Sequence, residues 1–361
     1  MTRPPFRLAP RARLAHAAAV GLLAALALVS GCSKKTTPTG PGGPAHTWLG
    51  LTPNPAPGET QDAVLLTLRS TGVNLFYQYA PWDSFETAPG VFRTSLLRQL
   101  VSAVRSLGGA TYVNLVIVDT NRRRLPADLA GLAFDDPALV SRVDRVVDSV
   151  LAVARSQPLL VLALGNEVDV YFSLHPDEFP AFLWLYQREV GRIHSALPGL
   201  PVGISTTWDG ASGTRSAYAD PLNAASDLAI YTYYPFQSVG DFLHRPPSTY
   251  EADVGAMRAR NPGKPYALQE VGYSSSAVNA GSDSLQADFV RRFRTHVANA
   301  LASDLLFADW FLYTDLPAAM VDTLIAYYGI DTPGFRAYLG NLGLRHADGT
   351  PKPGWNTWLN P

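Results

Sequence analysis

The chain has 361 residues, of which 47% are hydrophobic, and it carries 29 Lys and Arg against 30 Asp and Glu. A net charge of −1 without any Lys/Arg-rich run argues against a nucleic-acid-binding surface, so no nucleic-acid partner is expected. The single cysteine excludes internal disulfides, so the stability of the fold must rest on a hydrophobic core.

The first 31 residues resemble a signal peptide. Four arginines precede an apolar run over residues 17–29, which is too short and too rich in alanine for a permanent membrane span. The run ends in Val-Ser-Gly-Cys at Cys32, which resembles a bacterial lipobox, where lipid is attached to the cysteine. We therefore expect residues 1–31 to be removed and Cys32 to be lipidated, which is the only contact with a membrane that we expect. The alternative is an ordinary signal peptide with a chance cysteine.

Residues 32–46 consist largely of Lys, Thr, Pro and Gly, which predicts a flexible tether after the lipidated cysteine. Residues 47–361 are expected to form one domain outside the cytoplasm, at the bacterial cell envelope. Ser33 after the cysteine favours the outer membrane, if the host has one, by resemblance to sorted lipoproteins. The lack of a long exposed apolar pattern favours a monomer.

From residue 47 onward, short β-branched or aromatic runs alternate with longer amphipathic segments. The predicted strands are 47–51, 74–79, 111–118, 159–164, 201–206, 228–233, 265–270 and 306–313. The predicted helices are 61–70, 95–107, 137–156, 180–196, 250–260, 284–301 and 333–341, and the helical pattern is weakest over 216–225. Eight strands that alternate with helices predict an α/β fold, a single (β/α)8 TIM barrel over residues 47–361.

Two of these segments show the physical basis of the prediction. Asp136 can cap the helix that starts at Pro137, and an apolar stripe follows at helical spacing. The strand 159–164 is apolar throughout, which is typical of a parallel sheet covered by helices on both faces. An open doubly wound sheet is the alternative, but its Gly-rich nucleotide fingerprint is absent.

Two glutamates directly follow apolar strands. The fourth predicted strand ends in Leu-Gly-Asn166-Glu167, and the seventh ends in Leu-Gln269-Glu270. In a (β/α)8 barrel the active site lies at the C-terminal ends of the strands, and strands four and seven face each other. We therefore expect the two carboxylates to meet there. For either glutamate alone, a solvated loop residue or a helix N-terminal charge is the alternative interpretation.

The Asn-Glu that closes strand four and the Glu that closes strand seven resemble the clan A retaining glycoside hydrolases, which include cellulases, mannanases and endo-galactanases. The run from Gln269 to Ser274 is similar to the nucleophile strand of that clan. The resemblance implies that Glu167 is the acid/base, that Glu270 is the nucleophile and that Asn166 binds the sugar 2-hydroxyl. It implies a carbohydrate substrate, an extracytoplasmic oligo- or polysaccharide.

The resemblance also implies supporting residues on strands six and eight. A tyrosine at the end of strand six is expected to hydrogen-bond the nucleophile; Tyr233 is the prediction, with Tyr231 as the alternative if the register slips. Trp310 and Tyr313 on strand eight are predicted to stack on a sugar ring. Ordinary core packing is the alternative for all of these aromatic residues.

Further substrate contacts are expected from the loops after strands two and five, where Trp82 and Trp208 are predicted subsite walls; loop packing is the alternative. The clan usually carries an arginine at the end of strand two, and this chain lacks one. Gln78 is predicted to take part of that role. Arginines 122–124 follow strand three and could reach in, although three adjacent arginines are typical of a solvated loop. Without a nearby cation, the pKa of Glu270 is less depressed.

The sequence lacks the motifs of other common enzyme classes. The sequence has no Gly-x-Ser-x-Gly elbow, no phosphate loop and no histidine pair at metal-ligand helix spacing, so no metal or organic cofactor is expected. The sequence predicts a retaining β-glycosidase. A glycan-binding lipoprotein with weak or no catalysis on the same scaffold is the first alternative, and an envelope interaction protein with an incidental barrel mouth is the second. The sugar, the linkage and endo or exo action stay open.

Overall fold

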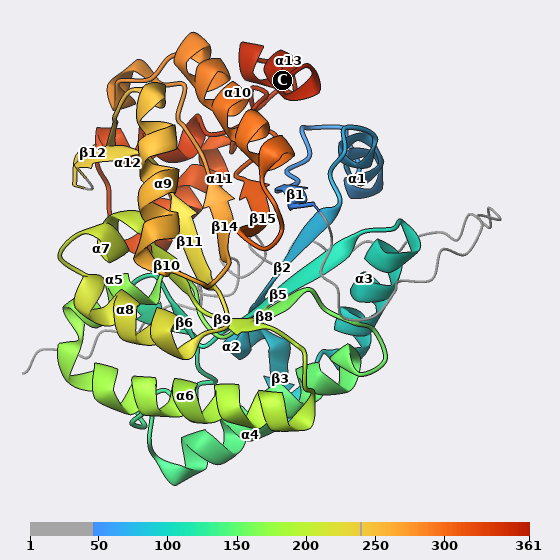
Figure 1. Ribbon diagram of the computed structural model, residues 1–361, viewed down its shortest axis with the longest axis vertical. Helices are drawn as coiled ribbons and strands as arrows, with labels where there is room; N and C mark the ends of the chain where they lie inside the picture. Colours follow the sequence, from blue (N-terminus) through green and yellow to red (C-terminus); the bar gives the residue numbers. More distant parts are fainter. Residues whose placement is uncertain (1–45, 239) are drawn as a thin grey trace, which may run out of the picture.

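The computed structural model describes residues 46–238 and 240–361 (Figure 1). Within these ranges the predicted strands are confirmed, with ends that differ by a few residues. They are β1 (Trp48–Leu51), β2 (Leu75–Pro81), β5 (Ala110–Val116), β8 (Val161–Ala163), β9 (Val202–Gly203) with β10 (Ser205–Thr207), β11 (Ala229–Tyr233), β14 (Tyr266–Val271) and β15 (Leu305–Trp310). The last strand ends at Trp310 instead of continuing to Tyr313.

The predicted helices are also confirmed, including the weakest one over 216–225. They are α1 (Gln61–Ser70), α3 (Thr94–Ser106), α4 (Pro137–Ala154), α6 (Phe179–Ala196), α8 (Ser216–Ala225), α9 (Tyr250–Arg260), α10 (Asp283–Asn299) and α12 (Pro333–Gly340). Helix α4 begins as expected, because the Asp136 side chain accepts a hydrogen bond from the Ala138 backbone N–H and Pro137 occupies the first turn.

Several short elements were not predicted from the sequence. They are α2 (Trp82–Phe85), α5 (Val168–Leu174), α7 (Trp208–Ser212), α11 (Ala318–Tyr328), α13 (Pro353–Leu359) and the hairpins β3–β4 (Glu86–Ala88, Val91–Phe92), β6–β7 (Val118–Asp119, Arg122–Arg123) and β12–β13 (Phe236–Ser238, Leu243–His244). Four of these five helices begin without a side-chain cap, so the usual N-terminal signal is missing.

The parallel strands form two sheets that meet at both edges. One sheet has the order β1-β15-β14-β11-β10 and the other β2-β5-β8-β9. Strands β9 and β10 are separated only by Ile204, and they pair with β8 and β11 respectively. At the other edge, the Asn74 backbone N–H beside β2 donates to the Leu49 carbonyl of β1 at 2.9 Å. The α/β prediction is confirmed, and this arrangement fits a (β/α)8 barrel.

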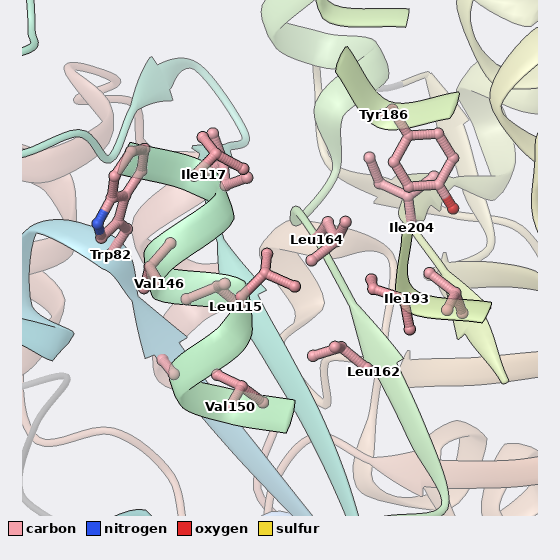
Figure 2. Close-up of a cluster of buried hydrophobic side chains, with 14 of the residues drawn as sticks. Trp82, Leu115, Ile117, Val146, Val150, Leu162, Leu164, Tyr186, Ile193 and Ile204 are labelled. Carbon is pink, nitrogen blue, oxygen red and sulfur yellow. The ribbon is translucent and has the colours of Figure 1, made fainter. Parts of the chain in front are cut away.

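The hydrophobic core lies on both faces of the sheets. Tyr112 and Phe307 belong to a buried cluster on the inner face, with their rings 4.7 Å apart. On the outer face, Figure 2 shows Val146 of α4, Leu162 of β8 and Ile193 of α6 within one cluster of buried apolar side chains. Because both faces of the strands are covered, polar side chains that carry chemistry are confined to the strand ends.

The predicted signal peptide, Cys32 and nearly all of the predicted tether lie outside the described residues. Within the residues that the structure describes, no helix is long and apolar enough to cross a membrane.

Candidate active site

A tight turn places Glu167 beyond the end of β8. Glu167 has a left-handed backbone (φ 47°, ψ 40°), which is costly for a residue with a long side chain, on the order of 1 kcal/mol or more. Gly165 makes the turn possible, because a Cβ there would lie 2.7 Å from a methyl group of Val168. Thr120, which hydrogen-bonds Glu167, is also left-handed (φ 48°). Such backbone strain concentrates at functional sites.

Both carboxylate oxygens of Glu167 accept a hydrogen bond. Thr232 of β11 donates to one at 2.7 Å, and Thr120, which follows β6, donates to the other at 2.9 Å. The side chain is partly exposed. Burial, followed by the negative charge of Glu270, raises the pKa of Glu167 to about 8, despite the lowering effect of the two hydroxyls. A carboxyl with a raised pKa is suited to donate a proton as a general acid.

Glu270 lies within β14, across the strand ends from Glu167, and is partly exposed. The Tyr234 hydroxyl donates to its carboxylate at 2.9 Å. Burial raises the pKa of Glu270 to about 7; the charges of Asp309 and Asp119 add to the rise, and the hydrogen bond from Tyr234 opposes it. Burial is thus the main cause of the raised pKa at both carboxyls, and only Glu270 accepts a hydrogen bond from a tyrosine.

Asn166 belongs to the same site and is held by two buried side chains. Gln269 Nε2 donates to Asn166 Oδ1 at 2.6 Å, and Asn166 Nδ2 donates to Asp119 Oδ1 at 3.0 Å. The hydroxyls of Tyr79 and Tyr327 donate to the other oxygen of Asp119. The structure therefore brings together the acid/base candidate, the nucleophile candidate and the asparagine that were predicted from the sequence.

Comparison with known proteins bears on the fold. No family model matches the sequence, and the search of curated proteins found no match. Solved structures do match: GH5_18 from Streptomyces cattleya has a TM-score of 0.67 at 19% identity, covering 87% of this chain and 79% of that one. The exo-beta-1,4-mannosidase Op5Man5 from Opitutaceae bacterium strain TAV5 has a TM-score of 0.64 at 18% identity over 87% of this chain.

A third similar structure is beta-glucuronidase 2 from Bacteroides uniformis, with a TM-score of 0.60 at 14% identity over 87% of this chain. The chain has the fold of the clan A glycoside hydrolases. It spans 58% of the length of the mannosidase and 35% of the length of the glucuronidase. The resemblance inferred from the sequence is therefore confirmed at the level of the fold.

Within this clan A fold, the tyrosine that contacts Glu270 is Tyr234, and the prediction of Tyr233 is wrong. The Tyr233 hydroxyl donates to Asp253 of α9, and its ring packs among the helices outside the sheet. Tyr231 also faces outward, where its hydroxyl accepts from Asn261. Side chains alternate between the two faces of a strand, so Thr232 points to Glu167 while its neighbours in the strand point away. Tyr234 follows the last residue of β11, and its side chain points to the same side as Thr232, where it contacts Glu270.

The strand-eight aromatic residues do not lie in the site. Trp310 is fully buried against Phe289 and Phe293 of α10, on the outer face of β15. Tyr313 is buried against Trp355, and the guanidinium of Arg345 lies 4.5 Å from the centre of its ring. The prediction that these two residues stack on a sugar is wrong, because the alternation along β15 directs Trp310 toward the helices.

The predicted subsite walls from the loops are also core residues. Trp82 is fully buried in the cluster of Figure 2, and its indole N–H donates to Glu86 at 2.7 Å. Trp208 is 6% exposed and packs edge-on against Tyr231. The Gln78 amide donates to the adjacent Tyr79 carbonyl at 3.1 Å, and none of the side-chain hydrogen bonds among the described residues joins Gln78 to Glu270.

The three consecutive arginines after strand three are not a solvated loop. Arg124 is 8% exposed and holds Asp83 through two hydrogen bonds of 2.8 Å. Arg123 pairs with Glu178, and the guanidinium of Arg122 lies 3.8 Å from the centre of the Tyr327 ring. None of the ion pairs in the described part of the chain includes Glu167 or Glu270, so the missing strand-two arginine is not replaced by another cation.

Sequence reasoning missed several residues of the site. Asp119 directly follows a predicted strand, so the inspection of every strand end would have found it. Asp309 lies on the inner face of β15 and is 2% exposed; Thr52 donates to one oxygen at 2.9 Å, and the other has no partner among the described residues. Gly50 is required opposite it, because a Cβ there would lie 2.5 Å from the carboxylate. Burial raises the pKa of Asp309 to about 8.

Among the described residues, no group of three or more His, Cys, Asp or Glu side chains is arranged to hold a metal ion. The ionisable side chains at the centre of the site are Glu167 and Glu270.

Proposed function

We propose that the protein is a retaining β-glycosidase that hydrolyses O-glycosidic bonds of an extracytoplasmic oligo- or polysaccharide. The observation that carries the proposal is the pair Glu167 and Glu270 at the ends of β8 and β14. Both carboxyls are partly exposed, and their surroundings raise the pKa of Glu167 to about 8 and that of Glu270 to about 7. A retaining glycosidase needs such a pair, one protonated and one ionised.

The proposed reaction has two steps. In the first, the carboxylate of Glu270 attacks the anomeric carbon, the glycosidic C–O bond breaks, and Glu167 gives its proton to the leaving oxygen. The glycosyl ester that forms removes the negative charge of Glu270, which is one of the causes that raise the pKa of Glu167. Glu167, which has given up its proton, then stays ionised more easily and takes a proton from the water that attacks the same carbon and releases Glu270.

The test is hydrolysis of a broad panel of β-glycans and aryl β-glycosides by the full chain, compared with Glu270→Gln and Glu167→Gln. We expect Glu270→Gln to lose activity by several orders of magnitude, and the first sugar released by the wild type to be the β anomer by proton NMR. Glu251→Gln is the matched control, because Glu251 is an exposed glutamate of α9 that pairs with Arg292. An α anomer as first product, or full activity in Glu270→Gln, contradicts the mechanism.

A glycan-binding protein with weak or no catalysis is the second candidate. The observation that favours it is the pKa of about 7 of Glu270, which leaves much of the nucleophile protonated in slightly acidic surroundings. It predicts that wild type and Glu270→Gln bind the same glycan with the same affinity by calorimetry, without turnover. Turnover of that glycan by the wild type excludes it.

We propose that lipid on Cys32 anchors the protein to the cell envelope, in the outer membrane if the host has one, and that the protein is a monomer. The Val-Ser-Gly-Cys run after an apolar segment supports the anchor. Metabolic labelling with a clickable fatty acid is expected to label the wild type but not Cys32→Ser, which should appear in the soluble fraction. Light scattering of that variant measures the oligomeric state. Equal labelling of both proteins contradicts the anchor.

A further inference from the structure

Residues 318–340, which comprise α11 and α12 and are here called the α11–α12 segment, follow β15 and lie at the same strand ends as the carboxyl pair. The segment is attached at two places, one beside the contact of Glu167 and one beside the contact of Glu270. Helix α11 was not predicted from the sequence, whereas α12 is the predicted helix that follows the last strand.

The first attachment joins the end of α11 to the chain that follows β6. Asn121 Nδ2 donates to the Tyr328 carbonyl at 2.9 Å, and the Tyr327 hydroxyl donates to Asp119. Arg124 donates to the same hydroxyl at 3.0 Å. Asn121 is the neighbour of Thr120, which holds Glu167. The C-terminal end of α11 is therefore fixed within one residue of the contact of the proposed acid/base.

The second attachment joins α12 to the chain segments that follow β11 and β14. The rings of Tyr338 and Tyr234 lie 5.2 Å apart, edge to face, and Tyr234 is the residue that holds Glu270. Phe335 packs on Phe242 with ring centres 4.8 Å apart, and Asn279 Nδ2 donates to the Gly334 carbonyl at 2.9 Å. The segment thus extends from the contact of one carboxyl to the contact of the other.

The α11–α12 segment has a hydrophobic core of its own, so it is a fixed part of the site. The core is built from buried side chains of both helices and of the chain around them: Phe242, Leu312, Val321, Ile325, Phe335, Tyr338, Leu339 and Leu342. Each large apolar side chain buried in this way contributes about 1.5–3 kcal/mol.

Two tyrosines of the segment lie beside the carboxyl pair. Burial, followed by the negative charges of Asp119, Glu167 and Glu270, raises the pKa of Tyr328. Burial and the charges of Glu167 and Glu270 also raise the pKa of Tyr338. Tyr328 is partly exposed, and none of the side-chain hydrogen bonds in the described part of the chain includes its hydroxyl.

We propose that the α11–α12 segment is a wall that closes one end of the site, so that the enzyme removes the terminal, non-reducing sugar of a glycan and does not cut within the chain. This inference rests on the proposed glycosidase function. A wall on the side of the leaving group would block the sugar that departs with its oxygen. The side that binds the sugar transferred to Glu270 can be closed without stopping the reaction. A wall next to that sugar excludes a second sugar linked to its non-reducing end.

The test compares aryl β-monoglycosides, in which one sugar occupies the glycosyl side, with insoluble dye-crosslinked β-mannan, β-glucan, xylan and galactan. We expect the full chain to release nitrophenol from at least one monoglycoside in a reaction that Glu270→Gln loses, and to release no dye from any polymer. Release of dye overturns the inference while the glycosidase function stands. If the full chain releases neither nitrophenol nor dye, the proposed function is overturned, and the inference with it.

Two variants test whether α11 forms the wall. Tyr328→Ala is expected to lower kcat/KM for the monoglycoside by about tenfold or more, and Tyr328→Phe, which keeps the ring, by less. Thr323→Ala is the control on the same helix, because among the described residues the Thr323 hydroxyl hydrogen-bonds only to the Ala319 carbonyl within α11. Unchanged kcat/KM in a folded Tyr328→Ala, with folding checked by its melting temperature, overturns the role of this residue and of the wall.

Discussion

The side-chain amide of Gln269 donates to the amide oxygen of Asn166 at 2.6 Å, and both residues directly precede the proposed catalytic glutamates. Two other side chains fix which end of the Gln269 amide faces Asn166, because Tyr112 and Asn114 both donate hydrogen bonds to the Gln269 oxygen. The nitrogen of Gln269 must then face Asn166, and the nitrogen of Asn166 must face Asp119. One N–H of Asn166 stays available to a sugar hydroxyl.

Gln269→Leu is expected to lower activity by about tenfold or more, since Asn166 loses its partner and its orientation. The loss should be smaller for a 2-deoxy glycoside, which has no hydroxyl for Asn166 to bind. Tyr112→Phe is the matched control: Asn114 still donates to Gln269, so a loss of a few-fold at most is expected. Rate assays on both substrates check this, and an equal loss on both contradicts the orientation role.

Tyr234→Phe and Tyr233→Phe should differ although the residues are adjacent. The Tyr234 hydroxyl lowers the pKa of Glu270, so its removal is expected to raise that pKa and move the acidic limb of the pH–rate profile upward. Tyr233→Phe removes a bond to Asp253 and should lower the melting temperature without moving the profile. Identical pH profiles for Tyr234→Phe and the wild type would falsify the contact.

The pH dependence of kcat/KM is expected to be a narrow bell. Activity rises as Glu270 ionises, with a pKa of about 7, and falls as Glu167 loses its proton, with a pKa of about 8. An aryl glycoside with a good leaving group needs no proton, so Glu167→Gln should keep the acidic limb and lose the basic one in the first step. A broad optimum at acidic pH contradicts these environments.

The raised pKa of Asp309 predicts that the free energy of unfolding falls as the pH rises. Its pKa is raised to about 8 in the folded protein, whereas an unfolded aspartate ionises at about 3.9. The folded state therefore binds the proton more tightly, and stability is lost as pH rises from about 4 to 8. Asp309→Asn removes this loss and is expected to raise the free energy of unfolding at pH 8 by on the order of 1–3 kcal/mol, with little effect at pH 4.

A buried aspartate with a cation provides the control for Asp309. Asp315 pairs with the buried Lys352 at 2.7 Å, so Asp315→Asn should destabilise the protein by about 3–5 kcal/mol at neutral pH. Urea unfolding at both pH values checks the pair of variants. Stabilisation of both, or of neither, would show that the missing cation is not what distinguishes the two sites.

The sequence alone determined the alternation of strands and helices and the position of Glu167 and Glu270 at strand ends. These features are local: the apolar strand over 159–164 and the cap at Asp136 depend on residues a few positions apart. The Asn166–Glu167 pair could be read in the same way, because it directly follows its strand.

Only the tertiary structure decided which neighbours complete the site. Whether Tyr233 or Tyr234 meets Glu270, and whether Trp310 faces sugar or helix, depends on a one-residue difference in strand alternation, and β11 pairs with β14 through an irregular register. The contact of Asn121 with Tyr328 joins residues 207 positions apart. No local pattern encodes such a contact, because it arises from the packing of α11 on a chain that the barrel brings to the same strand ends.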